Sequence, residues 1–203
     1  MADIRTFFAV HPEEGLESEI AALPYDVYDR SEAREQVKKA PGSFLAIDRP
    51  ESQFPEDQDM YAPEVYQKAH DMLADWIRKG AFVQDEKKCY YLYELTMDGR
   101  SQTGLVACAS IDDYLNGVIK KHENTRAEKE QDRIHHVDAC NAQTGPIFLA
   151  YRKDPTIAEV TAKVKQQKPM FDFVSEDGIG HKGWRVDAAE DTAAIADAFA
   201  KID

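Results

Sequence analysis

The clearest structural signal in the chain is residues 89–110, which read CYYLYELTMDGRSQTGLVACAS. Two runs rich in aromatic and β-branched residues, 89–97 and 100–110, flank the dipeptide Asp98-Gly99. Aspartate and glycine accept the positive φ angles of a tight two-residue turn, so this pattern is typical of a β-hairpin. We therefore expect two antiparallel strands here.

Helices and a second hairpin are expected on either side of this stretch. Pro63 stands where a first helical turn favours proline and Gly80 where a helix ends, with apolar residues at helical spacing between them. The same signals predict further elements: a helix from the N-cap Ser31 to residue 39, a strand over 43–47, a surface loop over 49–59, a strand over 146–151, a helix opening at Asp154-Pro155, a hairpin around Asp177-Gly178 and a last helix over 188–202.

Strands and helices neither alternate strictly along the chain nor fall into separate blocks. This order predicts an α+β fold, with a mostly antiparallel or mixed sheet and helices packed on it. The 203 residues are within the range of one large domain, so we expect a single α+β domain over residues 1–203.

The composition excludes several classes of protein. Lys and Arg number 25 against 38 Asp and Glu, and the formal charge of −13 disfavours binding to nucleic acid and to anionic membranes. The longest apolar stretch, residues 105–109, is too short for a membrane span of about 20 residues. Three cysteines without a Cys-x-x-Cys pair indicate neither a disulfide framework nor a zinc ribbon. We expect a reduced, cytoplasmic protein.

The densest group of reactive side chains lies in residues 119–136. Thr125 and Glu128 have capping-box spacing, which predicts a helix over residues 126–140 preceded by a loop with Lys121, His122 and Glu123. The positive end of that helix, with Arg126, Lys129 and Arg133 near one face, suits a phosphate or carboxylate. A solvated, charge-laced surface helix explains the same pattern. A metal site is disfavoured because His135 and His136 point to different faces of the helix.

Two loops provide further candidate residues. In residues 23–27, a proline-fixed turn can present Tyr25 and Asp26 to a cleft, although ordinary turn chemistry explains it equally. In residues 141–146, the small polar residues Asn141, Thr144 and Gly145 can place backbone amides against a ligand. An ordinary connection after a helix is the alternative there.

Several ordered motifs together resemble one protein family. They are Leu23-Pro24-Tyr25-Asp26-Val27, Ser43-Phe44-Leu45, residues 98–104 (DGRSQTG), Lys121-His122-Glu123-Asn124-Thr125 with Lys129, Asp132 and Arg133, and Thr144-Gly145-Pro146-Ile147-Phe148. In this order they are similar to the bacterial and archaeal domain of unknown function 1015. Members are usually about twice as long, so the resemblance implies an N-terminal half. The other half carries an Ala-Asp-Gly-His-His-Arg motif that is similar to that of ParB-like serine kinases and sulfiredoxin-type proteins, and this motif does not occur in residues 1–203.

The resemblance implies a nucleotide-dependent phosphotransferase that acts on a small hydroxyl substrate such as serine. ATP or ADP with magnesium would be bound by the full-length protein, and this chain alone would hold none of them and be inactive. We expect Glu123, His122 or Asp26 to act in catalysis, and an anionic or phosphorylated ligand to be bound by a set of five residues, namely Lys121, Thr125, Arg126, Lys129 and Arg133. The alternatives are a non-catalytic small-anion-binding or regulatory module and a structural partner domain.

The last helix suggests a partner for the chain. Ile195, Phe199 and Ile202 form an apolar stripe without a stop signal. If a C-terminal half covers this region, the chain by itself would expose an apolar patch there, and would self-associate into a homo-oligomer or fray.

Overall fold

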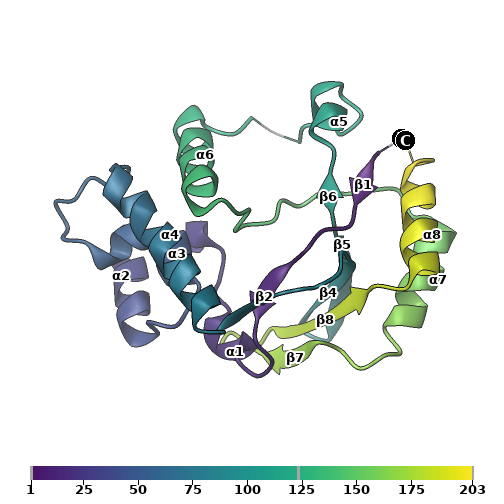
Figure 1. Cartoon of the computed structure of the whole chain (residues 1–203), viewed down its shortest axis with the longest axis horizontal. Coiled ribbons are helices and arrows are strands. Elements are labelled where there is room, and N and C mark those ends of the chain that lie inside the picture. The colour runs from purple at the N-terminus through teal and green to yellow at the C-terminus, as the bar shows by residue number, and fades with distance from the viewer. Residues whose placement is uncertain (1, 123, 203) are drawn as a thin grey trace. The chain divides into compact units, whose positions relative to one another are not determined.

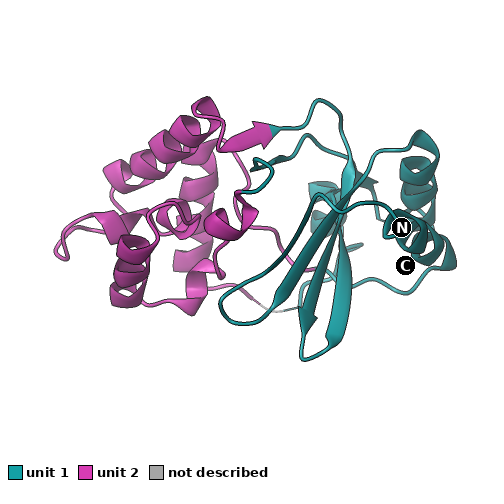
Figure 2. Ribbon diagram, turned by 90° about the horizontal axis from the view of Figure 1, so that it is seen from below, with its two compact units in different colours: residues 1–15, 84–123, 149–203 teal, residues 16–83, 124–148 magenta. Residues whose placement is uncertain are grey.

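The computed structural model describes residues 2–122 and 124–202. The chain divides into two compact units, each built from separate stretches of sequence (Figure 2). Unit 1 contains Met1–Gly15, Gln84–Glu123 and Leu149–Asp203, and unit 2 contains Leu16–Val83 and Asn124–Phe148. Helices and antiparallel strands give the α+β class expected from the sequence. The expectation of a single domain over residues 1–203 stays a prediction.

Unit 1 is built on a four-stranded antiparallel sheet with the order β5-β4-β8-β7 (Figure 1). The strands are β4 (Tyr90–Met97), β5 (Arg100–Val106), β7 (Phe171–Val174) and β8 (Gly180–Val186). Asp98 and Gly99 join β4 to β5 with φ angles of 51° and 76°, as a tight hairpin turn requires. Both hairpins expected from the sequence are therefore confirmed.

Two helices, α7 (Pro155–Val164) and α8 (Ala189–Phe199), pack on one face of this sheet. Asp154 caps α7 by accepting hydrogen bonds from the backbone N–H groups of Thr156 and Ile157, as its position before Pro155 predicted. Ile195 and Phe199 of α8 are buried in the core with Tyr90, Leu92, Trp184 and Val186. The expectation of an exposed apolar patch on α8 is wrong, because the sheet of unit 1 and helix α7 cover the apolar residues of α8. Unit 1 also contains β1 (Ile4–Arg5), β2 (Val10–Pro12), β6 (Cys108–Ala109) and α5 (Ile111–Leu115), and β1 pairs with β6.

Unit 2 is mainly helical. Its elements are α1 (Glu17–Ile20), η1 (Tyr25–Val27), α2 (Arg30–Lys39), α3 (Leu45–Asp48), η2 (Pro50–Gln53), α4 (Pro63–Arg78) and α6 (Ala127–Cys140), where η denotes a 3-10 helix. The strand β3 (Phe82–Gln84) lies at the boundary of the two units. One core joins α4 to the end of α6 through Ala69, Leu73, Phe82 and Cys140. A second lies between α2 and α3.

Three local expectations in unit 2 are wrong. Residues 45–47 belong to α3 and residues 43–44 to the turn before it, so no strand forms there. Leu45, Ala46 and Ile47 are all buried, and a short apolar run fits either structure. The N-cap of α2 is Asp29, which forms a capping box with Glu32, and not Ser31. Residues 49–59 are not only a surface loop, because η2 buries Pro50, Glu51 and Ser52.

The expected strand over residues 146–151 is also wrong. No ladder partner is formed there in the part of the chain that the structure describes, and Ile147 and Phe148 are 75% and 82% exposed. Within the same described residues, none of the helices combines the length and apolar character that crossing a bilayer demands.

Candidate functional site

In unit 2, Arg133 of α6 lies over the ring of Tyr25 in η1. Its guanidinium carbon is 4.4 Å from the ring centroid. Arg133 also donates from Nε and Nη2 to Oδ2 of Asp132, over 3.2 and 3.0 Å. The hydroxyl of Tyr66 donates to the other oxygen of Asp132 over 2.9 Å. Aromatic stacking and a carboxylate therefore fix the orientation of Arg133.

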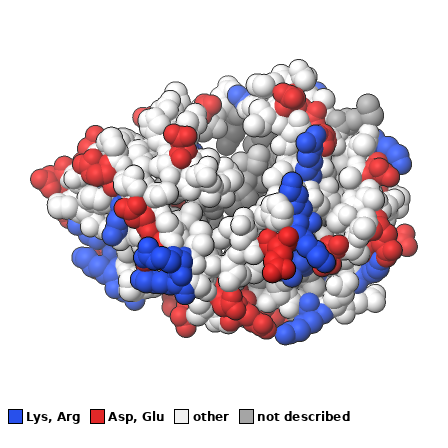
Figure 3. Space-filling model, viewed as in Figure 1, with Lys and Arg blue, Asp and Glu red and all other residues white. Residues whose placement is uncertain are grey.

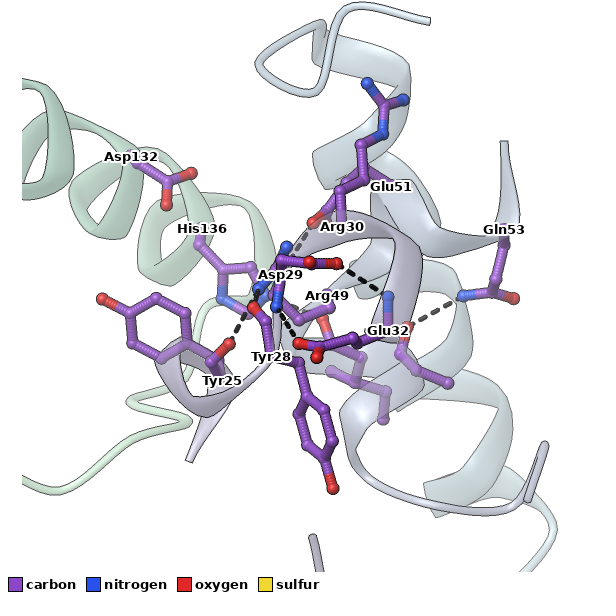
Figure 4. Close-up of polar contacts among 12 residues, drawn as sticks. Tyr25, Tyr28, Asp29, Arg30, Glu32, Arg49, Glu51, Gln53, Asp132 and His136 are labelled. Atoms are coloured by element: carbon purple, nitrogen blue, oxygen red, sulfur yellow. Dashed lines mark hydrogen bonds and ion pairs between the residues drawn. The ribbon is translucent and has the colours of Figure 1, made fainter. Parts of the chain in front are cut away.

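Arg49 binds the backbone of the η1 turn that carries Tyr25 (Figure 4). Nη1 of Arg49 donates to the backbone oxygens of Tyr25 and Tyr28 over 2.8 and 2.6 Å, and Nε donates to Oε1 of Glu51 over 2.5 Å. Only 9% of Arg49 and 3% of Glu51 are exposed. Because a buried arginine with three acceptors has little freedom, it fixes the position of Tyr25.

Four side chains lie at the end of α3, on α6 and in the segment after it. We call Asp48, His136, Cys140 and Thr144 the buried polar group; His136 and Cys140 are buried and the other two are half-buried. Nε2 of His136 is 2.9 Å from the backbone oxygen of Ile47, so this nitrogen carries a proton and donates it to the carbonyl. The hydroxyl of Thr144 lies 3.4 Å and Sγ of Cys140 lies 3.9 Å from Nδ1.

Burial raises the pKa of two members of this group, Asp48 and Cys140. It raises the pKa of Asp48 above its ordinary value, although His136, Thr144 and Arg133 act in the opposite direction. Oδ1 of Asp48 is buried and forms no hydrogen bond with the described residues. Burial also raises the pKa of Cys140 to about 11, and burial followed by the bond to Asp132 raises the pKa of Tyr66. Asp48 is thus a carboxyl group that resists losing its proton.

The N-terminus of α6 differs from the capping box that the sequence predicted. The N-cap is Arg126, it forms no side-chain cap bond, and Thr125 is exposed one residue earlier. The reason is that Thr125 lies one position too early to reach the first N–H groups of the helix. Arg126 is exposed and paired with Glu128, whereas Lys129 is half-buried in the first turn.

The candidate catalytic residues belong to different units of the chain. Asp26 is exposed in η1 next to Tyr25 and has no hydrogen-bond or ion-pair partner among the described residues. Lys121 and His122 are exposed and belong to unit 1, where Nζ of Lys121 lies 5.5 Å from the ring centroid of Tyr114. Glu123 lies outside the described residues.

The loop after α6 has more than one role. Asn141 is the C-cap of α6, with a left-handed φ of 49°, and Gly145 accepts a hydrogen bond at its backbone oxygen from the Gln143 side chain. These contacts are typical of a helix end. Of the three loop candidates Asn141, Thr144 and Gly145, Thr144 is the one that belongs to the buried polar group.

The structure thus brings together Tyr25 and Arg133, which the sequence had placed in two separate candidate sites. It adds Arg49 and Asp48, which sequence reasoning missed, and His136, which sequence reasoning considered only as a metal ligand. A charged pair inside an otherwise apolar stretch, Asp48-Arg49 after Leu45-Ala46-Ile47, was the signal available for two of them. Within the described residues, no group of three or more His, Cys, Asp or Glu side chains is arranged to hold a metal ion.

The fold and this cluster define an α+β protein with a fixed arginine on a helix of its second unit. The chain belongs to the family described as "Protein of unknown function (DUF1015)", which matches residues 4–203. The family resemblance drawn from the motifs is thereby confirmed. The chain matches no curated protein and no solved structure.

Proposed function

We propose that Lys129 and Arg133 of α6, with Tyr25 of η1, bind a phosphate group, as one wall of a nucleotide-dependent phosphotransferase that acts on a small hydroxyl substrate such as serine. The observation that carries this proposal is the fixed orientation of Arg133, between the ring of Tyr25 and the carboxylate of Asp132. A guanidinium group that is already oriented loses little entropy when it binds an anion.

The donors that Arg133 does not use toward Asp132 support a ligand role. Nε and Nη2 face Asp132, and Nη1 forms no hydrogen bond with any residue that the structure describes. Asp132 cancels much of the positive charge of Arg133, so this residue supplies directed donors more than net charge. Lys129 adds a cation four residues earlier, on the same face of α6.

The N-terminus of α6 adds to these contacts. No side-chain cap satisfies its first N–H groups within the described residues, and such groups favour anions. Thr125 and Arg126 at this helix end complete the phosphate-binding set that we propose in unit 2, and Lys121 stays a candidate from the sequence. Asn141, Thr144 and Gly145 remain the proposed substrate loop.

Catalysis of phosphoryl transfer consists mainly of positioning and charge neutralisation. The phosphoryl group would pass from the nucleotide to the substrate hydroxyl oxygen, and a carboxylate would accept the hydroxyl proton. Asp26, adjacent to Tyr25, is a candidate for that carboxylate, and Glu123 and His122 are candidates from the sequence. Magnesium would enter with ATP or ADP.

A non-catalytic small-anion-binding or regulatory role is the second candidate. The exposure of Asp26 favours it, because no contact among the described residues orients this carboxylate as a base. Anion binding would then stabilise the protein without turnover.

The first experiment measures binding of inorganic phosphate and of ATP to this chain by calorimetry. Arg133→Gln removes a charge-assisted hydrogen bond, which is expected to weaken binding about tenfold or more. The matched control is Arg100→Gln, an exposed arginine at the hairpin of unit 1, which should leave the affinity unchanged. Equal affinities for all three proteins would contradict phosphate binding at Arg133.

The second experiment tests turnover in the whole protein. Transfer from ATP or ADP to serine or another hydroxy-amino acid, lost in Asp26→Asn, Glu123→Gln or His122→Asn, supports the phosphotransferase. Binding without transfer supports the regulatory role. The absence of both would contradict both proposals and favour a structural partner domain.

A further inference from the structure

A second region of unit 2 has the features of a ligand site, and it shares no residue with the cluster around Arg133. It is a groove of about 420 Å³ between α2 and the segment from Ser52 to Pro55. This volume is in the range of small-molecule sites. We call it the α2 groove.

The α2 groove carries positive charge on an acidic protein. Helix α2 has four basic and two acidic residues, whereas every other helix in the described part of the chain is neutral or acidic. Lys and Arg side chains gather at the lower left of Figure 3, where Figure 1 draws α2. Two of the four basic residues, Arg34 and Lys38, line the groove.

Arg34 is partly fixed, as a recognition arginine should be. Its Nη2 donates to the backbone oxygen of Phe54 over 2.6 Å, and this is the one hydrogen bond it forms with the described residues through its side chain. Lys38 pairs with Glu35 in an exposed contact of 2.8 Å, which water screens and an anion can displace.

The second, independent observation is Ser52. It is only 5% exposed, lines the groove, and its hydroxyl forms no hydrogen bond with any described residue. An unsatisfied buried hydroxyl costs about 1–3 kcal/mol, so native proteins usually give such a group a partner. The hydroxyl oxygen is itself shielded from solvent, so a ligand acceptor in the groove could bind it only after the Ser52 side chain rotates toward the groove.

We infer that the α2 groove binds a small organic carboxylate. The carboxylate would lie against Arg34 and Lys38 and accept a hydrogen bond from the rotated Ser52 hydroxyl, and its apolar body would contact Val37, Phe54 and Pro55, which line the groove together with Gln53. A planar carboxylate fits the guanidinium fork, and the apolar wall favours a carbon chain over an inorganic anion.

The test is a titration of the chain with linear carboxylates from acetate to hexanoate, and with inorganic phosphate, followed in amide NMR spectra. We expect shifts confined to α2 and residues 50–55, with affinity rising about two- to fourfold per added methylene. Arg34→Gln should weaken hexanoate binding about tenfold, and Ser52→Ala severalfold without loss of stability, since its hydroxyl has no partner to lose. Lys38→Gln keeps the bond from Arg34 to Phe54 and is the second variant if Arg34→Gln perturbs the fold.

Arg133→Gln and Arg100→Gln serve as controls, and both should bind hexanoate as the unaltered chain does. Loss of phosphate or ATP binding in Arg133→Gln alone concerns the proposed function and not the groove. Shifts spread over the whole chain, phosphate binding as tight as hexanoate, or affinity unchanged by Arg34→Gln, Lys38→Gln and Ser52→Ala would overturn the inference.

Discussion

Arg49 and Glu51 form a salt bridge of 2.5 Å whose two side chains are only 11% and 4% exposed. Two residues apart in sequence, they place a paired charge inside unit 2. Arg49 extends this pair to the backbone oxygens of Tyr25 and Tyr28, so the pair connects η2 to the turn that carries Tyr25.

Removal of one partner of this pair should destabilise the chain strongly. Glu51→Gln leaves the buried Arg49 charge without a counterion, and we expect a loss of about 3–5 kcal/mol in the free energy of unfolding. Arg49→Met with Glu51→Leu removes both charges and should recover much of that loss. Urea unfolding of the unaltered chain, Glu51→Gln and the double variant measures both effects. A double variant with a lower free energy of unfolding than Glu51→Gln would contradict this account.

The Tyr25 ring should contribute to anion affinity through Arg133. Tyr25→Phe keeps an aromatic face under the guanidinium group and should change phosphate affinity little. Tyr25→Ala removes that face, and a cation–π contact of about 0.5–2 kcal/mol corresponds to a loss of roughly two- to thirtyfold. Calorimetry distinguishes the two variants, and equal losses would show that the hydroxyl, not the ring, matters.

Asp48 should make the chain less stable as the pH rises. Burial raises its pKa in the folded protein above the unfolded value of about 3.8. The folded state therefore binds more protons just above pH 3.8, and stability falls as the pH rises through the folded pKa. Asp48→Asn lacks this contribution.

The measurement is the difference in unfolding free energy between the unaltered chain and Asp48→Asn from pH 3.5 to 7. This difference isolates Asp48 from other carboxyl groups, such as Asp85, in which burial raises the pKa but hydrogen bonds from Tyr91, His11 and Arg185 outweigh it. The relative stability of the variant should increase with pH. If this difference in unfolding free energy did not change with pH, Asp48 would have the same pKa in the folded and unfolded states.

The three cysteines should react with thiol reagents at different rates. Cys108 is exposed, whereas Cys89 and Cys140 are buried. Burial raises the pKa of Cys89 and raises that of Cys140 to about 11, so little thiolate forms at neutral pH. We expect one fast equivalent with a disulfide reagent, lost in Cys108→Ser, and two that react only on unfolding. Fast labelling of Cys140 would show that the buried polar group opens in solution.

Signals between near neighbours in sequence were the ones that could be interpreted. Asp98-Gly99 specifies its turn, Asp154-Pro155 its helix start, and Pro63 with Gly80 the bounds of the longest helix within a few residues. The prediction of a strand over residues 43–47 was wrong because a run of five apolar and small residues is compatible with a strand and with a short helix alike. The prediction of a capping box at Thr125 was wrong because the helix begins one residue later than the motif requires.

For the candidate site, the sequence could predict individual residues but not the contacts between them. The sequence could nominate Tyr25 and Arg133, but it could not pair them, because the contact depends on where η1 and α6 meet in unit 2. The charged pair Asp48-Arg49 in an apolar stretch marks Arg49 in the sequence but not its contacts, since two of its three acceptors are backbone oxygens that any residue possesses. Whether Lys121, His122 and Glu123 join the other candidates stays a prediction.

The interleaving of the two units also determines the order in which they can fold during synthesis. Unit 2 requires residues up to 148, whereas the central strand β4 of unit 1 waits for β8, nearly ninety residues behind it on the nascent chain. Unit 2 can therefore close on the ribosome while β4 and β5 form only a hairpin, which is marginal by itself. Slow codons after residue 148 would lengthen that interval, and the cell would have to protect the apolar face of an unfinished sheet.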